Sequence, residues 1–408
     1  MLDDLRARLR GDGALVAGVL SGTSADGIDV GLVRVRARGS DLELGPVVAF
    51  ETSPFEPTLR ARVRAVLDGA PCGLRESALL SRDLGRAFGD AARTLADRTG
   101  VVVDLVGSHG QTVWHHDGRA ADGKATLQLG DGDHVAESSG CTTVSDFRQR
   151  DVAAGGEGAP LSALADPVIF ARVPRPCAVL NLGGMGNLTV LRERAEDVLA
   201  FDTGPANSLL DGLARRFLHA PCDRDGGSAA RGRVDEGWVA ELLSHPFFAT
   251  PVPRSTGRDT FGEPYVDAVV ERARARGLLE HGPDDVLASA TAFVAATVAQ
   301  SLARFVNPRA ERLVVAGGGV HNRALMLALY ERCGIPVGSS AAAGVDPDAR
   351  ESLLFAVLAA ACVLEIPLSH PGATGAPRGR CLGKISLGGT PPDRLGTRPG
   401  SGAGSRGA

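Results

Sequence analysis

Two segments of the chain carry the same order of a short apolar run, a glycine-rich turn and a second apolar run. The first reads ALVAGVL, SGTSADG and IDVGLVRVR over residues 14–36, and the second reads AVLNL, GGMG and NLTVL over residues 178–191. A further strand-like run follows each segment, at residues 41–50 and 197–204. Runs of β-branched and other apolar residues that are separated by glycines predict antiparallel strands. The repetition therefore predicts two lobes built on one plan.

Helical patterns follow the strands in both halves. Apolar residues recur at helical spacing over residues 58–98 and lead into the buried run VVVDLVGS at residues 101–108. In the second half we expect helices over residues 207–304, a strand at 312–317 and a buried helix at 351–364. This alternation of strands and helices predicts an α/β fold.

The Gly/Ala-rich segment AAGGEGAPL suggests a boundary between the lobes, which we expect at residues 1–152 and 153–387. Residues 388–408 are rich in Pro, Gly and Ser and poor in apolar residues, so they are predicted to form a disordered tail.

Composition excludes several classes of protein. A formal charge of −4 without a long basic run gives no indication of a nucleic-acid partner. The longest apolar run, Leu353 to Leu364, is much shorter than the ~20 residues that span a bilayer, so no membrane segment is expected. The seven cysteines form no C-x-x-C, and the chain begins without a basic export signal. These features predict a cytoplasmic protein with reduced thiols that acts on a small molecule.

Lysine is almost absent, which limits how the chain can bind phosphate. Only Lys124 and Lys384 occur, and neither stands in the Gly-Lys-Ser/Thr order of a P-loop. A phosphate must then be held by backbone N–H groups, hydroxyls, a metal ion or arginine. Each glycine-rich turn alone could be an ordinary tight turn. Two mirrored hairpin turns and a later glycine cluster together resemble the actin, hexokinase and heat-shock ATPase superfamily, in which two ribonuclease H-like lobes clamp ATP in the cleft between them.

A closer resemblance extends over almost the whole chain. Eight motifs, in order, are similar to those of anhydro-N-acetylmuramic acid kinases: SGTSADGID (21–29), GSHGQTVWH (107–115), DFRQRDVAAGGEGAPL (146–161), LNLGGMGNLTVL (180–191), FDTGPAN (201–207), DRDG (223–226), STGRDTF (255–261) and VAGGGVHN (315–322). Glu157 stands where the family usually has Gln, and Thr203 and Ala206 stand where it has Cys and Gly.

The resemblance implies an ATP-dependent kinase of cell-wall recycling. Water opens the anhydro bridge of 1,6-anhydro-N-acetylmuramic acid, and the released 6-oxygen takes the γ-phosphate of ATP. The products are N-acetylmuramic acid 6-phosphate and ADP, and Mg²⁺ accompanies the nucleotide. The resemblance also leaves a homodimer as one option for the assembly. Two alternatives stay open: a kinase of another amino sugar, and a non-catalytic nucleotide- or sugar-binding sensor of the same fold.

The resemblance also assigns roles to residues. Asp202 matches the general base, and Asp26 is the candidate for holding the metal through water. The residues expected to bind ATP and its phosphates are Gly22, Thr23, Ser24, Ala25, Asp26, Gly27, Ile28, Asp29, Gly183, Gly184, Asn187, Gly204, Gly317, Gly318, Gly319 and Asn322. The residues expected to bind the sugar are Ser108, His109, Gln111, Thr112, Arg148, Arg150 and Glu351.

Ordinary structural roles compete with several of these assignments. Asp202 could cap the following helix, Asp26 could form a turn, and Glu351 could be a first-turn acid. The lactyl carboxylate of the sugar suits a guanidinium, for which Arg150 is preferred to Arg148 because it abuts the glycine-rich loop. Glu157 could pair with Arg150 if the two side chains meet.

Overall fold

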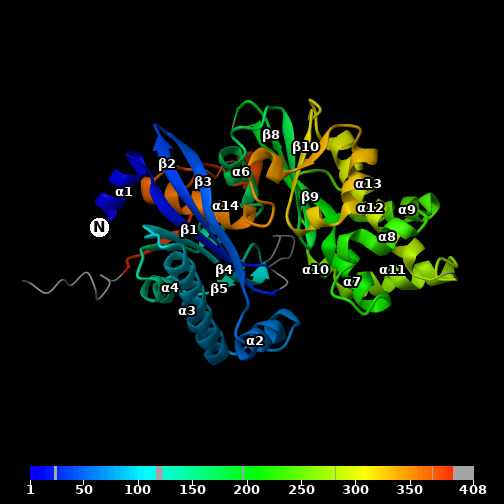
Figure 1. Cartoon of the computed structure of the whole chain (residues 1–408), viewed down its shortest axis with the longest axis horizontal. Coiled ribbons are helices and arrows are strands. Elements are labelled where there is room, and N and C mark those ends of the chain that lie inside the picture. Colours follow the sequence, from blue (N-terminus) through cyan, green and yellow to red (C-terminus); the bar gives the residue numbers. More distant parts are fainter. Residues whose placement is uncertain (23–24, 116–122, 195–196, 281, 370, 389–408) are drawn as a thin grey trace, which may run out of the picture.

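Two β-sheets, with helices outside and between them, make up the computed structural model of the chain (Figure 1). The structure describes residues 1–22, 25–115, 123–194, 197–280, 282–369 and 371–388. The predicted disordered tail lies outside these residues, except for Gly388.

The first sheet has the strand order β12-β6-β4-β1-β2-β3, with β5 paired to β4. Its strands are β1 (Ala14–Ser21), β2 (Ile28–Arg38), β3 (Asp41–Ser53), β4 (Leu105–His115), β5 (Thr126–Leu129), β6 (Thr143–Ser145) and β12 (Lys384–Ser386). Strands β1, β2 and β3 are antiparallel neighbours, whereas β4 runs parallel to both β1 and β6. The three antiparallel strands predicted for the start of the chain are confirmed.

The second sheet repeats this plan with the order β11-β10-β7-β8-β9. Its strands are β7 (Cys177–Leu182), β8 (Met185–Leu191), β9 (Leu199–Pro205), β10 (Leu313–Ala316) and β11 (Val337–Ser339). Strands β7, β8 and β9 are again antiparallel, and β10 again runs parallel to its two neighbours. Both sheets therefore have the ribonuclease H-like order 3-2-1-4-5, which confirms the predicted two-lobed, actin-like architecture.

Helices form three layers around the two sheets. The outer face of the first sheet packs against α2 (Pro57–Leu67), α3 (Leu74–Thr99) and α4 (Gly132–Ser139). The layer between the sheets contains α6 (Ser162–Ile169) and α14 (Arg350–Leu364), and α1 (Leu2–Arg10) packs on α14 and on β1 and β2 of the first sheet. The second lobe is covered by α7 (Asn207–Phe217), α8 (Gly227–Arg231), α9 (Glu236–Leu243), α11 (Glu263–Ala275), α12 (Asp284–Phe305) and α13 (Arg323–Cys333). The short helices are α5 (Phe147–Ala153), α10 (Arg258–Phe261) and α15 (Pro371–Thr374).

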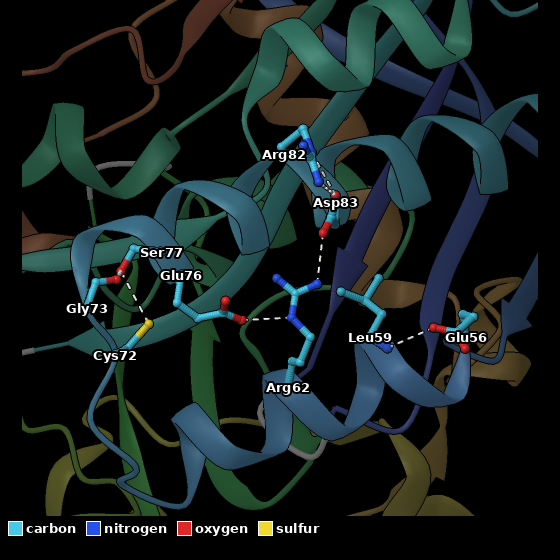
Figure 2. Close-up of polar contacts among 9 residues, drawn as sticks. All are labelled: Glu56, Leu59, Arg62, Cys72, Gly73, Glu76, Ser77, Arg82 and Asp83. Atoms are coloured by element: carbon cyan, nitrogen blue, oxygen red, sulfur yellow. Dashed lines mark hydrogen bonds and ion pairs between the residues drawn. The ribbon is translucent and has the colours of Figure 1, made fainter.

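Arg62 connects the first two long helices of the outer layer. Its Nε lies 2.7 Å from Glu76 and its Nη1 lies 2.8 Å from Asp83, both on α3 (Figure 2). At the start of α2, the carboxylate of Glu56 accepts hydrogen bonds from the backbone N–H groups of Thr58 and Leu59. This cap satisfies backbone donors that the first helical turn leaves free.

A row of three glycines brings α14 into direct contact with the first sheet. Gly18 on β1 pairs with Gly31 on β2 and with Gly107 on β4, so the three residues lie side by side across the sheet. A Cβ atom on Gly18 would lie 1.7 Å from the carbonyl oxygen of Ser352, and one on Gly107 would lie 2.2 Å from that of Phe355. Only glycine allows the backbone of the helix to approach the strands this closely.

The boundary predicted at residue 152 does not coincide with the division between the sheets. Helix α14 packs on β1, β2 and β4, and β12 pairs with β6, so the chain returns to the first sheet after residue 350. Gly388 is buried, and a Cβ there would lie 2.4 Å from the carbonyl carbon of Cys141. Gly388, the first residue of the predicted tail, therefore packs on the first lobe.

One helix is long and apolar enough, by length and composition, to cross a membrane. This helix is α12, and 83% of its most apolar window is buried inside the protein. It packs against α7, α8, α9 and α13, which fits the core helix of a folded lobe.

We predict that Gly18→Ala strongly destabilises the protein. The added methyl group would overlap the backbone of α14, and overpacking of this kind costs about 1–3 kcal/mol or more. The melting temperature should fall by several degrees. Gly227→Ala is the matched control, because its Cβ meets nothing closer than 3.9 Å. Equal melting temperatures for the two variants would show that α14 does not depend on the glycine row.

Candidate active site

Three polar residues form a row across the antiparallel strands of the second sheet. Asn181 on β7 pairs with Asn187 on β8, and Asn187 pairs in turn with Asp202 on β9. Direct cross-strand partners project from the same face of a sheet. Asn181 donates from Nδ2 to Glu351 Oε1 at 2.9 Å, and Glu351 belongs to the first turn of α14. The row therefore faces the layer between the two lobes.

Asp202 lies within β9, which continues to Pro205. Its Oδ2 accepts a hydrogen bond from the backbone N–H of Thr256 at 2.8 Å. Burial raises the pKa of Asp202 to about 7, although the Thr256 N–H and the charges of Arg254 and Arg148 oppose the shift. The carboxylate thus titrates near neutral pH, where a general base is most useful.

Arg254 fixes the backbone beside this carboxylate. Its Nε donates to the carbonyl oxygen of Asp202 at 3.1 Å, and the N–H of Asp202 donates to the carbonyl oxygen of Arg254 at 2.9 Å. The guanidinium also donates to the carbonyl oxygens of Phe247 and Phe248 and lies 4.6 Å from the ring centroid of Phe247. These contacts hold the strand and the following loop together, so Arg254 positions Asp202.

On the first-lobe side, the half-buried Arg148 pairs with the buried His109. Arg148 donates from Nε to His109 Nε2 at 2.9 Å and from Nη1 to the carbonyl oxygen of Gly158 at 2.8 Å. His109 stacks on Phe355 of α14 with ring centroids 4.6 Å apart. Burial and the charge of Arg148 keep the pKa of His109 well below 6.5, so the imidazole is neutral and accepts the hydrogen bond.

Arg148 is, with Arg254, one of two cations whose charge acts on the candidate base. Burial lowers its pKa to about 10, and the carboxylates of Glu351, Asp151 and Asp202 all act on it in the opposite direction. It therefore remains charged at neutral pH. The group joins residues from distant parts of the sequence: Arg148 of α5, Glu351 of α14 and Asp202 of β9.

The structure does not bring Arg150 into this group. Its side chain is exposed, and its charge acts on the thiols of Cys362 and Cys381. Residues two apart on a helix point about 200° away from each other, so Arg148 and Arg150 of α5 cannot both face the cleft. Glu157 does not pair with Arg150 either, because its Oε1 lies 2.6 Å from Nζ of Lys124.

The turn between β1 and β2 lies beside the predicted sugar residues of β4. Gln111 donates from Nε2 to the carbonyl oxygen of Gly22 at 3.2 Å. Thr112 accepts a hydrogen bond at its hydroxyl from Gln128 of β5, at 3.3 Å. Ala25 is buried with a φ of 49°, which gives the turn a left-handed residue. Thr23 and Ser24 lie outside the described residues, and Gly27 leads directly into β2 at Ile28.

The two acids of this turn have different surroundings. Asp26 is largely exposed and pairs with Arg60 at 3.0 Å. Asp29 accepts a hydrogen bond from the hydroxyl of Thr52 at 2.6 Å, and burial raises its pKa to about 6, helped by the negative charges of Glu351 and Asp348. Asp29 therefore has an unneutralised carboxylate, whereas Asp26 has a cationic partner. Among the described residues, no group of three or more His, Cys, Asp or Glu could hold a metal by itself.

The glycine-rich elements of the second lobe converge on one corner. The amide of Asn207 donates to the carbonyl oxygen of Leu182, and its backbone N–H donates to that of Gly183. A Cβ on Gly317 would lie 2.8 Å from Oδ1 of Asn181. Gly318 and Gly319 open the short helix η4 (Gly318–His321), which contacts β7.

Three of the predicted nucleotide residues have structural contacts of their own. Asn322 caps α13 by accepting a hydrogen bond from the N–H of Leu325 at 2.9 Å, and it lies beside Gly226 of the DRDG motif. Gly204 has a φ of 136°, and a Cβ there would lie 2.8 Å from the ring of Phe248. Gly184 accepts hydrogen bonds at its carbonyl from the N–H groups of Ala206 and Ser208.

Buried polar atoms without partners gather around these residues. Within the part of the chain that the structure describes, the unpartnered buried atoms include Ser21 Oγ, Ser108 Oγ, Gln111 Oε1, Asn181 Oδ1, Asn187 Oδ1 and Thr256 Oγ1. Such atoms are rare in native proteins unless water or a ligand satisfies them. Their concentration on both sides of the cleft indicates a binding site for a polar ligand.

Three contributors were not singled out by the sequence: Asn181, Arg254 and Thr256. The row Asn181–Asn187 could have been found from the alternation of polar residues in β7 and β8. Arg254 offers no local signal, because its partners are backbone carbonyl groups that the fold brings together.

Comparison with known proteins agrees with this geometry. A family model described as anhydro-N-acetylmuramic acid kinase matches residues 14–388, from the first residue of β1 to Gly388. An anhydro-N-acetylmuramic acid kinase of Salinibacter ruber is 41% identical over 398 residues, which cover 95% of this chain and 99% of the relative. An anhydro-N-acetylmuramic acid kinase of Xanthomonas campestris is 43% identical over 377 residues, which cover 91% of this chain and 97% of the relative.

Solved structures are more distant. The xylulose kinase of Rhodospirillum rubrum aligns with a TM-score of 0.41 and 14% identity, over 85% of this chain and 90% of that chain. Such a low score adds nothing to the architecture given by the strand order. The family model and the curated relatives, in contrast, cover almost the complete chain. The chain belongs to the anhydro-N-acetylmuramic acid kinase family.

Proposed function

We propose that this kinase opens 1,6-anhydro-N-acetylmuramic acid with water and phosphorylates the 6-oxygen that the opening releases. One observation carries the proposal: Asp202, a carboxylate with a pKa of about 7, shares a sheet face with Asn187 and Asn181 and interacts with the charge of the half-buried Arg148. A base and a cation therefore flank one polar site between the lobes.

In the proposed reaction, Asp202 takes a proton from the water that attacks the anomeric carbon. The bond between this carbon and the bridging oxygen breaks, and that 6-oxygen forms a bond to the γ-phosphorus of ATP as ADP leaves. The proton on Asp202 then passes to solvent. A carboxylate whose pKa lies near 7 suits the first step, because much of it is ionised at neutral pH while it remains basic enough to take a proton. The Thr256 N–H and Arg254 hold its oxygens and backbone in place.

ATP is proposed to lie between the two hairpin turns, at residues 22–29 and 183–184, with its adenosine toward Gly317–Gly319. Bound Mg²⁺ would neutralise charge on the phosphates. Of the two acids in the first turn, Asp29 fits a role near the metal better than Asp26 does. Asp29 has acidic neighbours and a raised pKa, while Asp26 already pairs with Arg60. The cytoplasm, which supplies ATP, is the proposed place of the reaction, and the seven free cysteines fit it.

Arg148 is proposed to bind the lactyl carboxylate of the sugar. Its guanidinium is half-buried, and His109 and the Gly158 carbonyl group fix two of its nitrogen atoms. A carboxylate can pair with the donors that remain, because a guanidinium has five N–H groups. Glu351, held by Asn181, would then face the sugar hydroxyl groups from the α14 side.

We predict that Asp202→Asn keeps nucleotide binding and loses most turnover. An amide cannot accept the proton of the attacking water, and the loss of a general base costs about 10² to 10⁴ in rate. Steady-state formation of the sugar 6-phosphate, with ATP binding measured separately by calorimetry, checks both parts. Near-normal turnover would remove Asp202 from the mechanism.

The pKa of Asp202 also predicts how activity and stability depend on pH. We expect kcat/KM to fall as the pH drops through about 7, because protonation inactivates the base, and the residual activity of Asp202→Asn to lack this step. Stability should respond in the opposite direction. The pKa of Asp202 is raised in the folded state, so its ionisation destabilises the fold at pH values above the pKa of the unfolded chain. The substitution Asp202→Asn should therefore raise the melting temperature more at pH 8 than at pH 5. A flat profile near pH 7 in the wild type would contradict the assignment.

Arg148 and Arg150 form a matched pair on one short helix. Arg148→Gln should weaken use of anhydro-N-acetylmuramic acid by about tenfold to a hundredfold, as expected for a lost charge-assisted contact, and should affect a carboxylate-free anhydro sugar much less. Arg150→Gln should leave kcat/KM for both sugars unchanged, because its side chain is exposed. Equal losses on the two sugars for Arg148→Gln would mean that it does not bind the carboxylate.

A further inference from the structure

The second lobe has a cavity of about 440 Å³ away from the glycine-rich turns. It lies at the start of β10 and β11, where Leu313 and Val337 begin the two strands, whereas Gly317 follows the opposite end of β10. We call it the rear cavity. Its lining residues come from the loop after α6, from β10 and β11, and from η5 (Ser340–Ala343): Arg172, Val173, Pro174, Arg312, Leu313, Val314, Pro336, Val337, Gly338, Ser339, Ala342 and Ala343.

The lining combines an apolar wall with two positive charges. Val173, Val314 and Ala343 belong to or pack against the core between the sheets. Arg172 and Arg312 are the charged residues, and no acidic side chain lines the cavity. Throughout the described residues, neither guanidinium has a carboxylate within ion-pair distance, although most arginines of this chain have such a partner or a carbonyl group.

Arg312 carries a further sign of a missing partner. Its Nε is buried and donates to no described residue. Leaving a buried charged donor without an acceptor costs more free energy than leaving a neutral donor unpaired. Such atoms are therefore usually satisfied by a bound ion or by water. Apolar walls with one or two well-placed polar groups are typical of small-molecule sites.

We propose that the rear cavity is a second binding site, for a small organic anion with an apolar body. A carboxylate or a phosphate monoester would pair with Arg312 and Arg172, because the guanidinium fork suits both groups. The apolar part would lie against Val173, Leu313 and Val314. The site is separate from the proposed catalytic cleft, since it shares no residue with the cleft and opens at the other end of the same strands.

The rear cavity is joined to the cleft by a short series of backbone contacts. From η5, Val345 donates its N–H to the carbonyl oxygen of Ser340, and Gly317 donates its N–H to the carbonyl oxygen of Pro347. The same segment runs directly into α14 and Glu351. An occupant of the rear cavity therefore lies against the segment that supports both the Gly317 loop and the first turn of α14.

Calorimetric titration of the full chain with four six-carbon probes tests the proposal: hexanoate, hexyl phosphate, 1-hexanol and hexylamine. We expect one or both anions to bind about tenfold or more tightly than the alcohol and the amine. The two anions distinguish a carboxylate ligand from a phosphate ligand, and tighter binding of either supports the site. Equal binding of alcohol and anion, or no binding of either anion, would overturn it.

Variants locate the binding. Arg312→Gln removes the unpartnered cation, and Gly338→Leu fills the cavity from a strand position whose Cβ meets nothing within 4 Å, so it should fold normally. Both should weaken anion binding by about tenfold or more. Arg86→Gln, at an exposed arginine of α3, and Arg148→Gln, in the proposed cleft, should leave it unchanged. Binding that survives Gly338→Leu, or that is lost in Arg148→Gln, would place the anion elsewhere and refute the rear site.

Discussion

The close packing of α14 on the glycine row of the first sheet determines where almost everything else in the site lies. Because Gly18, Gly31 and Gly107 lack side chains, the helix lies directly on the strands, and its first turn reaches the second sheet. There Glu351 accepts a hydrogen bond from Asn181, which begins the row of cross-strand partners that continues with Asn187 and ends at Asp202. One turn later, Phe355 stacks on His109, which in turn receives the hydrogen bond from Arg148. A single helix thus aligns the cation of one lobe with the carboxylate of the other.

A buried ion pair secures this helix at its first residue. Arg350 and Asp166 of α6 are 1% and 0% exposed, and Arg350 Nε lies 3.1 Å from Asp166 Oδ1. Replacing such a pair by apolar residues can be neutral, but removing one partner leaves an uncompensated charge and typically costs about 3–5 kcal/mol. The pair therefore acts mainly as a constraint on geometry. It joins α6 and α14, the two helices that lie between the sheets, next to the residue that contacts Asn181.

The sequence was sufficient to predict the repeated strand plan, the position of the glycine-rich turns and the candidate base, because each depends on local patterns or on motifs in order. It was insufficient where distant parts of the chain meet. The return of α14 and β12 to the first sheet is set by packing partners more than 200 residues earlier, as in the pairing of Lys384 with Ser145, and no local pattern records it. The choice between Arg148 and Arg150 depended on the rotational phase of a seven-residue helix, which its few apolar residues did not fix. Arg254 was overlooked because it binds carbonyl groups, which every residue has.

Burial, only partly offset by hydrogen bonds and positive charge, explains why two acids of the site have pKa values far above normal. Asp29 and Asp202 reach about 6 and about 7 because burial disfavours their charged forms, and the carboxylate of Glu351 adds to the effect at Asp29. Arg148 faces three carboxylates, those of Glu351, Asp151 and Asp202, so it cannot neutralise them all, even with Arg254 also acting on Asp202. Such a cleft favours a nucleotide with several negative charges only when a cation accompanies it. At Asp202, Arg254 and Arg148 oppose the effect of burial without reversing it, so the carboxylate stays basic enough to accept a proton near neutral pH, and a further arginine in place of His109 would weaken that property.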